Sequence, residues 1–139
     1  MRSAHFCVLA LLLSLSHRGH AQSMNAPDSP CREVVVTSEL AQCLGLALKA
    51  TDTKLNQTYA KVQHLLSPDE AKTLVQAQRL WMQYRDATCN AEYGLYGGGT
   101  GGPPTRLACL EAETRAREAS LQRSFGWLKE KSGGRAGGA

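Results

Sequence analysis

The chain has 139 residues, and its 16 Lys and Arg residues against 12 Asp and Glu residues give a formal net charge of +4. The basic residues are interspersed with the acidic ones, without the concentrated basic stripe of a nucleic-acid-binding protein, so we expect no nucleic-acid partner. A chain of this length has room for one domain.

The first 21 residues have the pattern of a secretory signal peptide. Arg2 is followed by an apolar run over residues 6–15 and by the sequence GHA at residues 19–21. This run is about half the roughly 20 residues that a membrane-spanning helix needs. We therefore expect cleavage after residue 21, no membrane anchor, and a periplasmic or secreted protein. Arg2 and Arg18 would leave with this segment, so 14 basic residues would face 12 acidic ones in the exported chain.

The two ends of the exported chain have the composition of flexible segments. Residues 22–30, QSMNAPDSP, are polar with two prolines and are predicted to be a flexible leader. Residues 132–139, SGGRAGGA, are predicted to be a flexible Gly-rich tail. The domain itself is predicted over residues 31–131.

Four cysteines follow the predicted cleavage site, and an even number in a small exported domain indicates two disulfides. They are Cys31, Cys43, Cys89 and Cys109. A four-cysteine zinc site is disfavoured, because 11, 45 and 19 residues separate the cysteines and no CxxC pair is present. We therefore predict no metal.

The first helix is predicted over about residues 38–66, where apolar residues recur at steps of three and four. This stripe comprises Leu40, Leu44, Ala47, Thr51, Leu55, Tyr59, Val62 and Leu66.

A well-marked helix start follows in the sequence SPDE. Ser67 takes the N-cap, Pro68 the first helical position and Glu70 the third, which forms a capping box. The second helix is predicted to end at about residue 93. Its stripe comprises Leu74, Ala77, Trp81, Tyr84 and Thr88.

Residues 94–105, GLYGGGTGGPPT, are predicted to be a non-helical connector. One interpretation is a flexible link; the other is a mobile contact loop, with Tyr93 and Tyr96 as the possible partner contact, because interfaces favour tyrosine. GGGTGG formally matches GxGxxG, but no strand precedes it, so we reject a phosphate site. Thr105 is predicted to cap the third helix. The inner face of that helix comprises Leu107, Leu110, Thr114, Leu121, Phe125 and Leu128.

Three amphipathic helices with short connections predict an all-α fold, a three-helix up-down-up bundle. Antiparallel packing brings Cys43, Cys89 and Cys109 to one pole, so geometry alone leaves the disulfide connectivity open. We predict Cys31–Cys43 and Cys89–Cys109, of which the second would join the ends of the connector.

Polar and aromatic residues gather where the predicted register brings the helices together. The set comprises Asp52, Asn56, Gln78, Trp81, Arg85, Asp86 and Arg117. A buried arginine needs a carboxylate, which either Asp52 or Asp86 could supply to Arg85. Asp52 is also expected near Arg117, and Trp81 could accept a guanidinium on its face. The set is either a structural polar network that fixes helix register or a ligand-binding polar face.

No catalytic residues are predicted. His64 is the one histidine after residue 21, and general acid–base chemistry usually uses a histidine or two carboxylates with separated pKa values. With the cysteines in disulfides, no thiol nucleophile remains. We therefore predict that the protein is not an enzyme and uses no cofactor.

The motifs also match a known family. In chain order they are Cys43, Asp52, Leu55-Asn56, Tyr59, Ala77-Gln78-Arg79, Trp81, Tyr84-Arg85-Asp86, Cys89, Cys109, Thr114, Arg117 and Leu121. With these motifs the chain resembles the LprI-type lysozyme inhibitors, small exported bacterial proteins, over about residues 31–128. The segment AQRxWxxYRDxxC is the specific part.

The resemblance implies a helical, disulfide-bonded envelope protein that blocks a muramidase without catalysis. The alternative is a structural or adaptor module that binds another envelope protein. The chain is slightly basic, as are its expected exported residues, so its overall charge opposes an encounter with the strongly basic lysozymes of animals.

Overall fold

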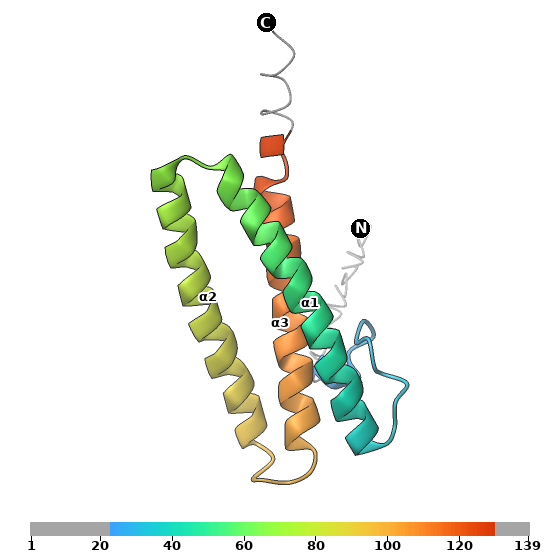
Figure 1. Cartoon of the computed structure of the whole chain (residues 1–139). Helices are drawn as coiled ribbons and strands as arrows, with labels where there is room; N and C mark the ends of the chain where they lie inside the picture. The colour runs from blue at the N-terminus through green and yellow to red at the C-terminus, as the bar shows by residue number, and fades with distance from the viewer. Residues whose placement is uncertain (1–22, 130–139) are drawn as a thin grey trace, which may run out of the picture.

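The computed structural model describes residues 23–129, which form a three-helix bundle preceded by a short 3-10 helix (Figure 1). Helix η1 spans Ser23–Asn25, α1 Thr37–Leu65, α2 Pro68–Gly94 and α3 Gly102–Phe125. The predicted all-α, up-down-up fold is confirmed. The predicted signal peptide and Gly-rich tail lie outside the described residues. Within residues 23–129, none of the helices has the combined length and apolar character needed to cross a membrane.

The turn between α1 and α2 is built as the sequence predicts. The Ser67 backbone N–H donates to the Glu70 carboxylate at 2.8 Å, and the Glu70 N–H donates to the Ser67 hydroxyl at 3.4 Å. This capping box satisfies backbone groups at the start of α2. Pro68 disfavours helical backbone in the residue before it, so α1 ends at Leu65 and the turn is short.

Helix α3 begins four residues earlier than predicted. Gly101 is its N-cap, and the two prolines after Gly102 lie in the first turn, where a missing N–H leaves no helical hydrogen bond unmade. Thr105 is therefore inside the helix and not its cap; its buried hydroxyl donates to the Gly101 carbonyl oxygen at 2.9 Å. The prediction that residues 94–105 are non-helical is wrong for Gly94, the last residue of α2, and for residues 102–105.

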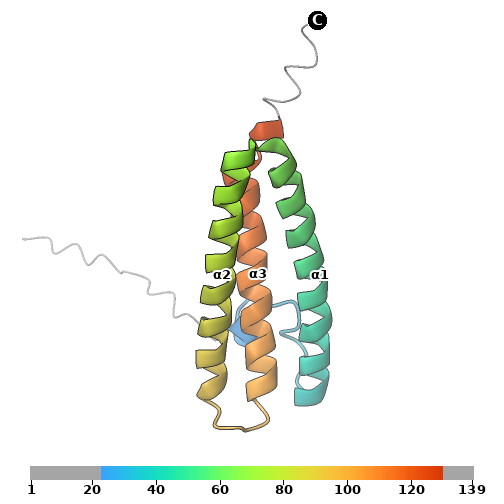
Figure 2. The same cartoon turned by 60° about the vertical axis from the view of Figure 1, so that its left-hand side comes forward.

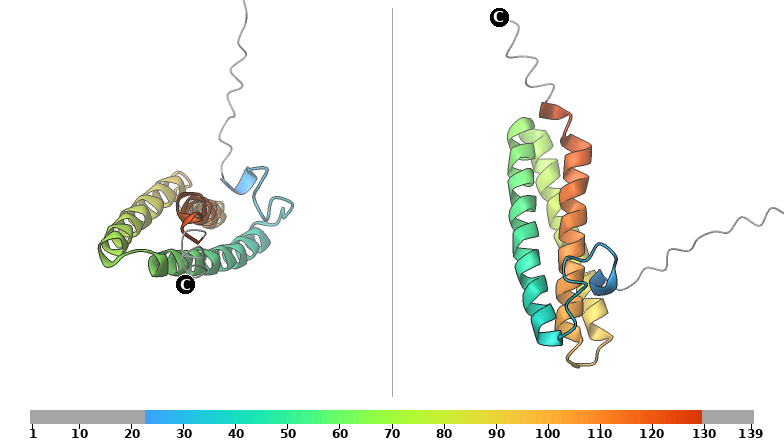
Figure 3. Two further views of the ribbon diagram at one scale, coloured as in Figure 1. Left: turned by 90° about the horizontal axis from the view of Figure 1, so that it is seen from above. Right: turned by 90° about the vertical axis from the view of Figure 1, so that its right-hand side faces the viewer.

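Helix α3 is the central element of the bundle. It packs against both α1 and α2, whereas α1 and α2 make few close contacts with each other. Seen along the bundle, α3 lies in the angle between the other two helices (Figure 3). Side chains of all three helices therefore line the space between α1 and α2, among them Asp52 of α1, Arg85 of α2 and Leu110 of α3.

Both predicted disulfides are present, with Cα–Cα distances of 6.1 Å for Cys31–Cys43 and 5.5 Å for Cys89–Cys109. The first ties the segment before α1 to that helix, and the second ties α2 to α3. Both lie toward the end of the bundle opposite the α1–α2 turn, which we call the disulfide pole.

The segment before α1 packs on α3 (Figures 2 and 3). The Thr105 hydroxyl lies 3.6 Å from the Met24 sulfur, and Arg115 forms an ion pair with Asp28 at 2.7 Å. Ser29 is buried. The polar composition of residues 22–30 predicts a flexible leader, whereas the described part of this segment is in contact with α3. These contacts were missed because their partners lie more than 80 residues further along the chain.

The face of α2 that packs on α3 contains only part of the predicted apolar stripe, of which Leu74, Trp81 and Thr88 are partly or fully buried. Tyr84 has 58% of its surface exposed, and Ala77 is exposed as well. Gln78, Arg85 and Cys89, which the predicted stripe did not include, are also partly or fully buried. The helix is turned this way because Cys89 must meet its disulfide partner on α3 and because Gln78 and Arg85 make polar contacts with that helix.

Candidate functional site

Arg85 lies at the centre of the predicted polar set, with 17% of its side chain exposed. Its Nε and Nη2 atoms both lie 2.9 Å from Asp86 Oδ1, and its Nη1 lies 3.4 Å from the hydroxyl of Thr114 on α3. The positive charge is thus balanced by the next residue of the same helix, and a neutral hydroxyl provides the contact to the neighbouring helix.

Asp52 is not part of this ion pair. Its carboxylate accepts a hydrogen bond from Asn56 Nδ2 at 3.1 Å, one turn further along α1. Within residues 23–129 it forms an ion pair with neither Arg85 nor Arg117; of the two carboxylates predicted as alternatives for Arg85, Asp86 is the one that pairs with it. The reason is the separation of α1 from α2: Asp52 and Arg85 both line a hollow of about 310 Å³.

Trp81 carries two arginines over its ring. The Cζ atom of Arg85 lies 5.0 Å from the ring centroid and that of Arg117 lies 5.8 Å away. Both distances are within the range of a cation–π contact. Arg117 Nε also donates to Gln78 Oε1 at 3.0 Å. The predicted proximity of Arg117 to Trp81 is confirmed, and the contacts join α2 to α3.

The pKa of Arg117 is lowered from its ordinary value because burial removes water from the charged guanidinium. Tyr59 on α1 offsets part of this effect. No carboxylate among the described residues forms an ion pair with Arg117. It therefore differs from Arg85, whose charge is paired directly.

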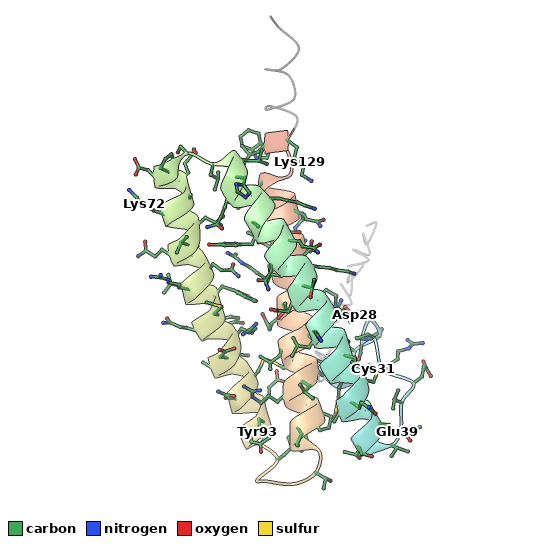
Figure 4. All side chains as sticks on the ribbon, viewed as in Figure 1. Asp28, Cys31, Glu39, Lys72, Tyr93 and Lys129 are labelled. Atoms are coloured by element: carbon green, nitrogen blue, oxygen red, sulfur yellow. A yellow bond between two sulfur atoms is a disulfide. The ribbon has the colours of Figure 1, made fainter. Side chains whose placement is uncertain are left out.

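Two hollows flank these arginines. The larger, which we call the turn-end hollow, has a volume of about 720 Å³. Its lining includes Leu66, Glu70, Leu74, Ala77, Arg117, Phe125 and Trp127. The smaller, the central hollow, is lined by Gly45, Leu48, Lys49, Asp52, Arg85 and Leu110. Side chains project into the space between the α1 and α2 ribbons in Figure 4. The arginines over Trp81 connect the two hollows, because Arg117 lines the first and Arg85 the second.

The two tyrosines predicted as a possible partner contact lie against their own loop. A Cβ added at Gly101 would lie 2.8 Å from the Tyr96 ring, and one added at Gly102 would lie 2.9 Å from the Tyr93 ring. Both glycines are therefore needed for this close packing. Tyr93 keeps 39% of its surface exposed, and Leu95, which lies between the two tyrosines in the sequence, is 81% exposed.

A second polar cluster, on the other side of α3, was missed by the sequence analysis. The Glu111 side chain is 4% exposed; it accepts hydrogen bonds from the Thr51 hydroxyl at 3.0 Å and from Arg115 Nε at 3.2 Å. Arg115 also forms the ion pair with Asp28. The spacing of Glu111 and Arg115 was a usable signal, but nothing in the sequence marked the glutamate as buried.

Within residues 23–129, no group of three or more His, Cys, Asp or Glu side chains is arranged to hold a metal ion. The polar set is thus built from arginine, amide, hydroxyl and aromatic groups. Such groups bind and position other molecules through charge, hydrogen bonds and ring contacts.

Comparison with known proteins connects this arrangement to a family. The family model described as "Lysozyme inhibitor LprI" matches residues 31–121. The chain belongs to the LprI lysozyme inhibitor family. The match contains both disulfides and every residue of the predicted polar set, and it confirms the resemblance based on the sequence motifs.

An uncharacterized protein, R02472, of Rhizobium meliloti (strain 1021) is 30% identical to this LprI protein over 127 residues. The similarity covers 82% of this chain and 89% of the relative. No solved structure matches the chain. The family name points to lysozyme inhibition, while the assignment of that activity to particular residues depends on the geometry described above.

Proposed function

We propose that this LprI protein is an exported bacterial envelope protein that binds a muramidase and blocks its cleft without catalysing a reaction. The observation that carries the proposal is the family match over residues 31–121. Export is supported by the signal-peptide pattern of the first 21 residues and by two disulfides, which persist mainly in oxidising compartments.

The α2–α3 loop is the element that we propose to enter the cleft. Residues 94–101 carry no charge and include five glycines, so the loop is narrow, and Leu95 is its most exposed apolar side chain at 81%. The Cys89–Cys109 disulfide and the rings of Tyr93 and Tyr96 support the loop. A loop held in one conformation loses less conformational entropy on binding.

Charge is expected to slow binding to a basic lysozyme and not to assist it. The formal net charge of the chain is positive, and like charges repel before contact. Because salt screens this repulsion, the association rate should rise with moderate ionic strength. This dependence is opposite to that of an inhibitor attracted by charge.

A turbidity assay with purified protein and an animal-type lysozyme tests the activity. We expect inhibition by the parent protein and at least about tenfold weaker inhibition by Leu95→Ala, because removal of an interface anchor commonly costs more than 1 kcal/mol. Leu80→Ala is the matched control, since Leu80 is 61% exposed on α2, away from the loop.

Absence of inhibition at a large molar excess of folded protein would exclude the proposed activity for that enzyme. Inhibition that is equal for the parent, Leu95→Ala and Tyr93→Ala would retain the activity but reject the loop as the inhibitory element.

The second candidate is a structural or adaptor module that binds an endogenous envelope protein. It is favoured by Leu80 and Tyr84, which lie one turn apart on α2 and are 61% and 58% exposed. A pull-down from envelope extract should then enrich a partner that is lost with Leu80→Glu. This result, together with a negative lysozyme assay, would favour the adaptor over the inhibitor.

A further inference from the structure

Arg117 has hydrogen-bonding capacity that the protein itself does not use. Its Nε donates to Gln78, but its two terminal amino groups make no hydrogen bond in the part of the chain that the structure describes. Its guanidinium lies over the ring of Trp81, and no carboxylate among the described residues forms an ion pair with it. A partly buried guanidinium in this state is stabilised further by an anion that accepts from its terminal N–H groups.

The space beside Arg117 is predominantly apolar. Seven of the twelve residues that line the turn-end hollow are apolar, among them Leu66, Leu74 and Phe125. Its volume of about 720 Å³ falls within the range of about 300–1,000 Å³ that is usual for small-molecule sites. Trp127 also lines the hollow and is held there by a hydrogen bond from its Nε1 to the Ser124 carbonyl oxygen at 3.0 Å.

We propose that the turn-end hollow binds the carboxylate form of a single-chain fatty acid, with its carboxylate on Arg117 and its alkyl chain against Leu74 and Phe125. The inference goes beyond the proposed inhibition, because the hollow lies toward the opposite end of the bundle from the α2–α3 loop.

The charges around the hollow favour a carboxylate over other head groups. One guanidinium matches one carboxylate in charge and in its two-pronged geometry. A phosphate monoester would bring nearly two negative charges to the same single cation. Glu70, the acidic residue of the lining, is bonded to Ser67 in the capping box at the start of α2.

Titration of the purified protein with decanoate, without lysozyme, tests this proposal. Binding is measured by calorimetry and by tryptophan fluorescence, since Trp127 lines the hollow. We expect saturable binding of decanoate and at least about tenfold weaker binding of decanol and decyltrimethylammonium, which lack the anion. Decyl phosphate should also bind less tightly than decanoate.

Two variants address the site from different sides. Arg117→Gln removes the cation, and Ala77→Trp fills the hollow from an exposed position on α2. Each should weaken decanoate binding at least about tenfold. Arg123→Gln is the matched control, because Arg123 is an exposed arginine of α3 that does not line the hollow. If circular dichroism shows that Arg117→Gln is unfolded, Ala77→Trp decides.

The proposal is overturned if the folded parent shows no saturable binding, if decanol binds as tightly as decanoate, or if neither folded variant weakens binding. Binding of a peptidoglycan fragment in place of decanoate would likewise assign the hollow to a different ligand class. None of these outcomes depends on whether the protein inhibits a lysozyme.

Discussion

Arg85 shows how a charged residue is accommodated in a small bundle. Its carboxylate partner, Asp86, is the neighbouring residue and is half exposed, so the pair forms without help from another helix. The contacts that involve the rest of the fold are the Thr114 hydroxyl and the Trp81 ring. The ion pair therefore offsets the cost of partial burial, while the neutral contacts hold the position of α2 on α3.

We expect Arg85→Ala to lower the free energy of unfolding by about 2 kcal/mol, because it removes a mostly buried guanidinium and its charge-assisted hydrogen bonds. Urea denaturation measures this change. Arg79→Ala is the control, since Arg79 is exposed on the same helix and surface substitutions usually stay within about 0.5 kcal/mol. Asp86→Ala should destabilise more than Asp52→Ala. The reverse order would mean that Arg85 is paired across the helices after all.

At the scale of elements, the α2–α3 loop is held by rings packed on glycines. The Tyr93 ring occupies the space that a side chain at Gly102 would need, and the Tyr96 ring does the same at Gly101. Gly98 has a φ of +84°, a backbone conformation that other residues adopt only with strain. The glycines therefore permit close packing at one side of the loop and a left-handed turn at its tip.

We expect Gly102→Ala to destabilise the fold by about 1–2 kcal/mol, because the new methyl group overlaps the Tyr93 ring. A double-mutant cycle with Tyr93→Ala tests the cause: the cost should fall by at least half when the ring is absent. Gly94→Ala is the control, because a Cβ there would meet nothing within 4 Å. An unchanged cost in the Tyr93→Ala background would place the conflict elsewhere.

The segment before α1 is held to α3 by an ion pair whose strength depends on pH. The hydrogen bond from Arg115 and the charge of that arginine lower the pKa of Asp28 below its ordinary value of 3.8. A group with a lowered pKa contributes stability that is fully present above the unfolded-state value and is lost as pH falls through the folded-state value. The contribution should therefore begin to fall below about pH 4 and be lost as the pH drops through the lowered folded-state pKa.

We expect Asp28→Asn to lower the melting temperature slightly at pH 7 and by less at pH 2.5, which lies below the ordinary pKa of the carboxyl group. Because Asp28 has 66% of its side chain exposed, solvent screening should keep the effect below about 1 kcal/mol. Asp69→Asn is the control, since Asp69 is an exposed acid on α2 that pairs with Lys72 in the first turns of the same helix. An equal difference between Asp28→Asn and parent at both pH values would show that the carboxylate charge is not responsible.

At the scale of the molecule, covalent bonds and the capped turn constrain opposite ends of the bundle. The turn at Ser67 joins α1 to α2, and the Cys89–Cys109 disulfide joins α2 to α3 at the other end. The Cys31–Cys43 disulfide fixes the segment that precedes α1 beside that helix. Helix α3 is thus covered from both sides, although α1 and α2 make few close contacts with each other.

We expect the double replacement Cys89→Ser/Cys109→Ser to lower the free energy of unfolding by about 3 kcal/mol, from the entropy of closing a loop with a sequence separation of 20 residues. Cys31→Ser/Cys43→Ser should lower it less, because its separation is 12 residues, but should expose residues 23–30 to proteolysis. Urea denaturation and limited proteolysis measure the two effects. Faster cleavage of that segment in the first variant than in the second would contradict these roles.

The sequence by itself determined the local features of this protein. The apolar period predicted three helices, SPDE predicted the start of α2 to the residue, and the cysteine count indicated two disulfides, although the cysteine positions left the pairing open. The helix period and the capping box depend on contacts within about one helical turn. The antiparallel topology brings three of the cysteines to one end of the bundle. The family resemblance also followed from motif order alone.

Tertiary structure alone decided which of those residues meet. Whether Arg85 pairs with Asp52 or Asp86 depends on the gap between α1 and α2, which no spacing in the sequence encodes. Burial of Glu111 and the packing of Tyr93 on Gly102 likewise depend on the position of α3 between its neighbours. The physical reason is that helix periodicity shows which residues share one face of a helix. Which residues of two helices meet depends on the distance between the helices and on the rotation of each about its axis.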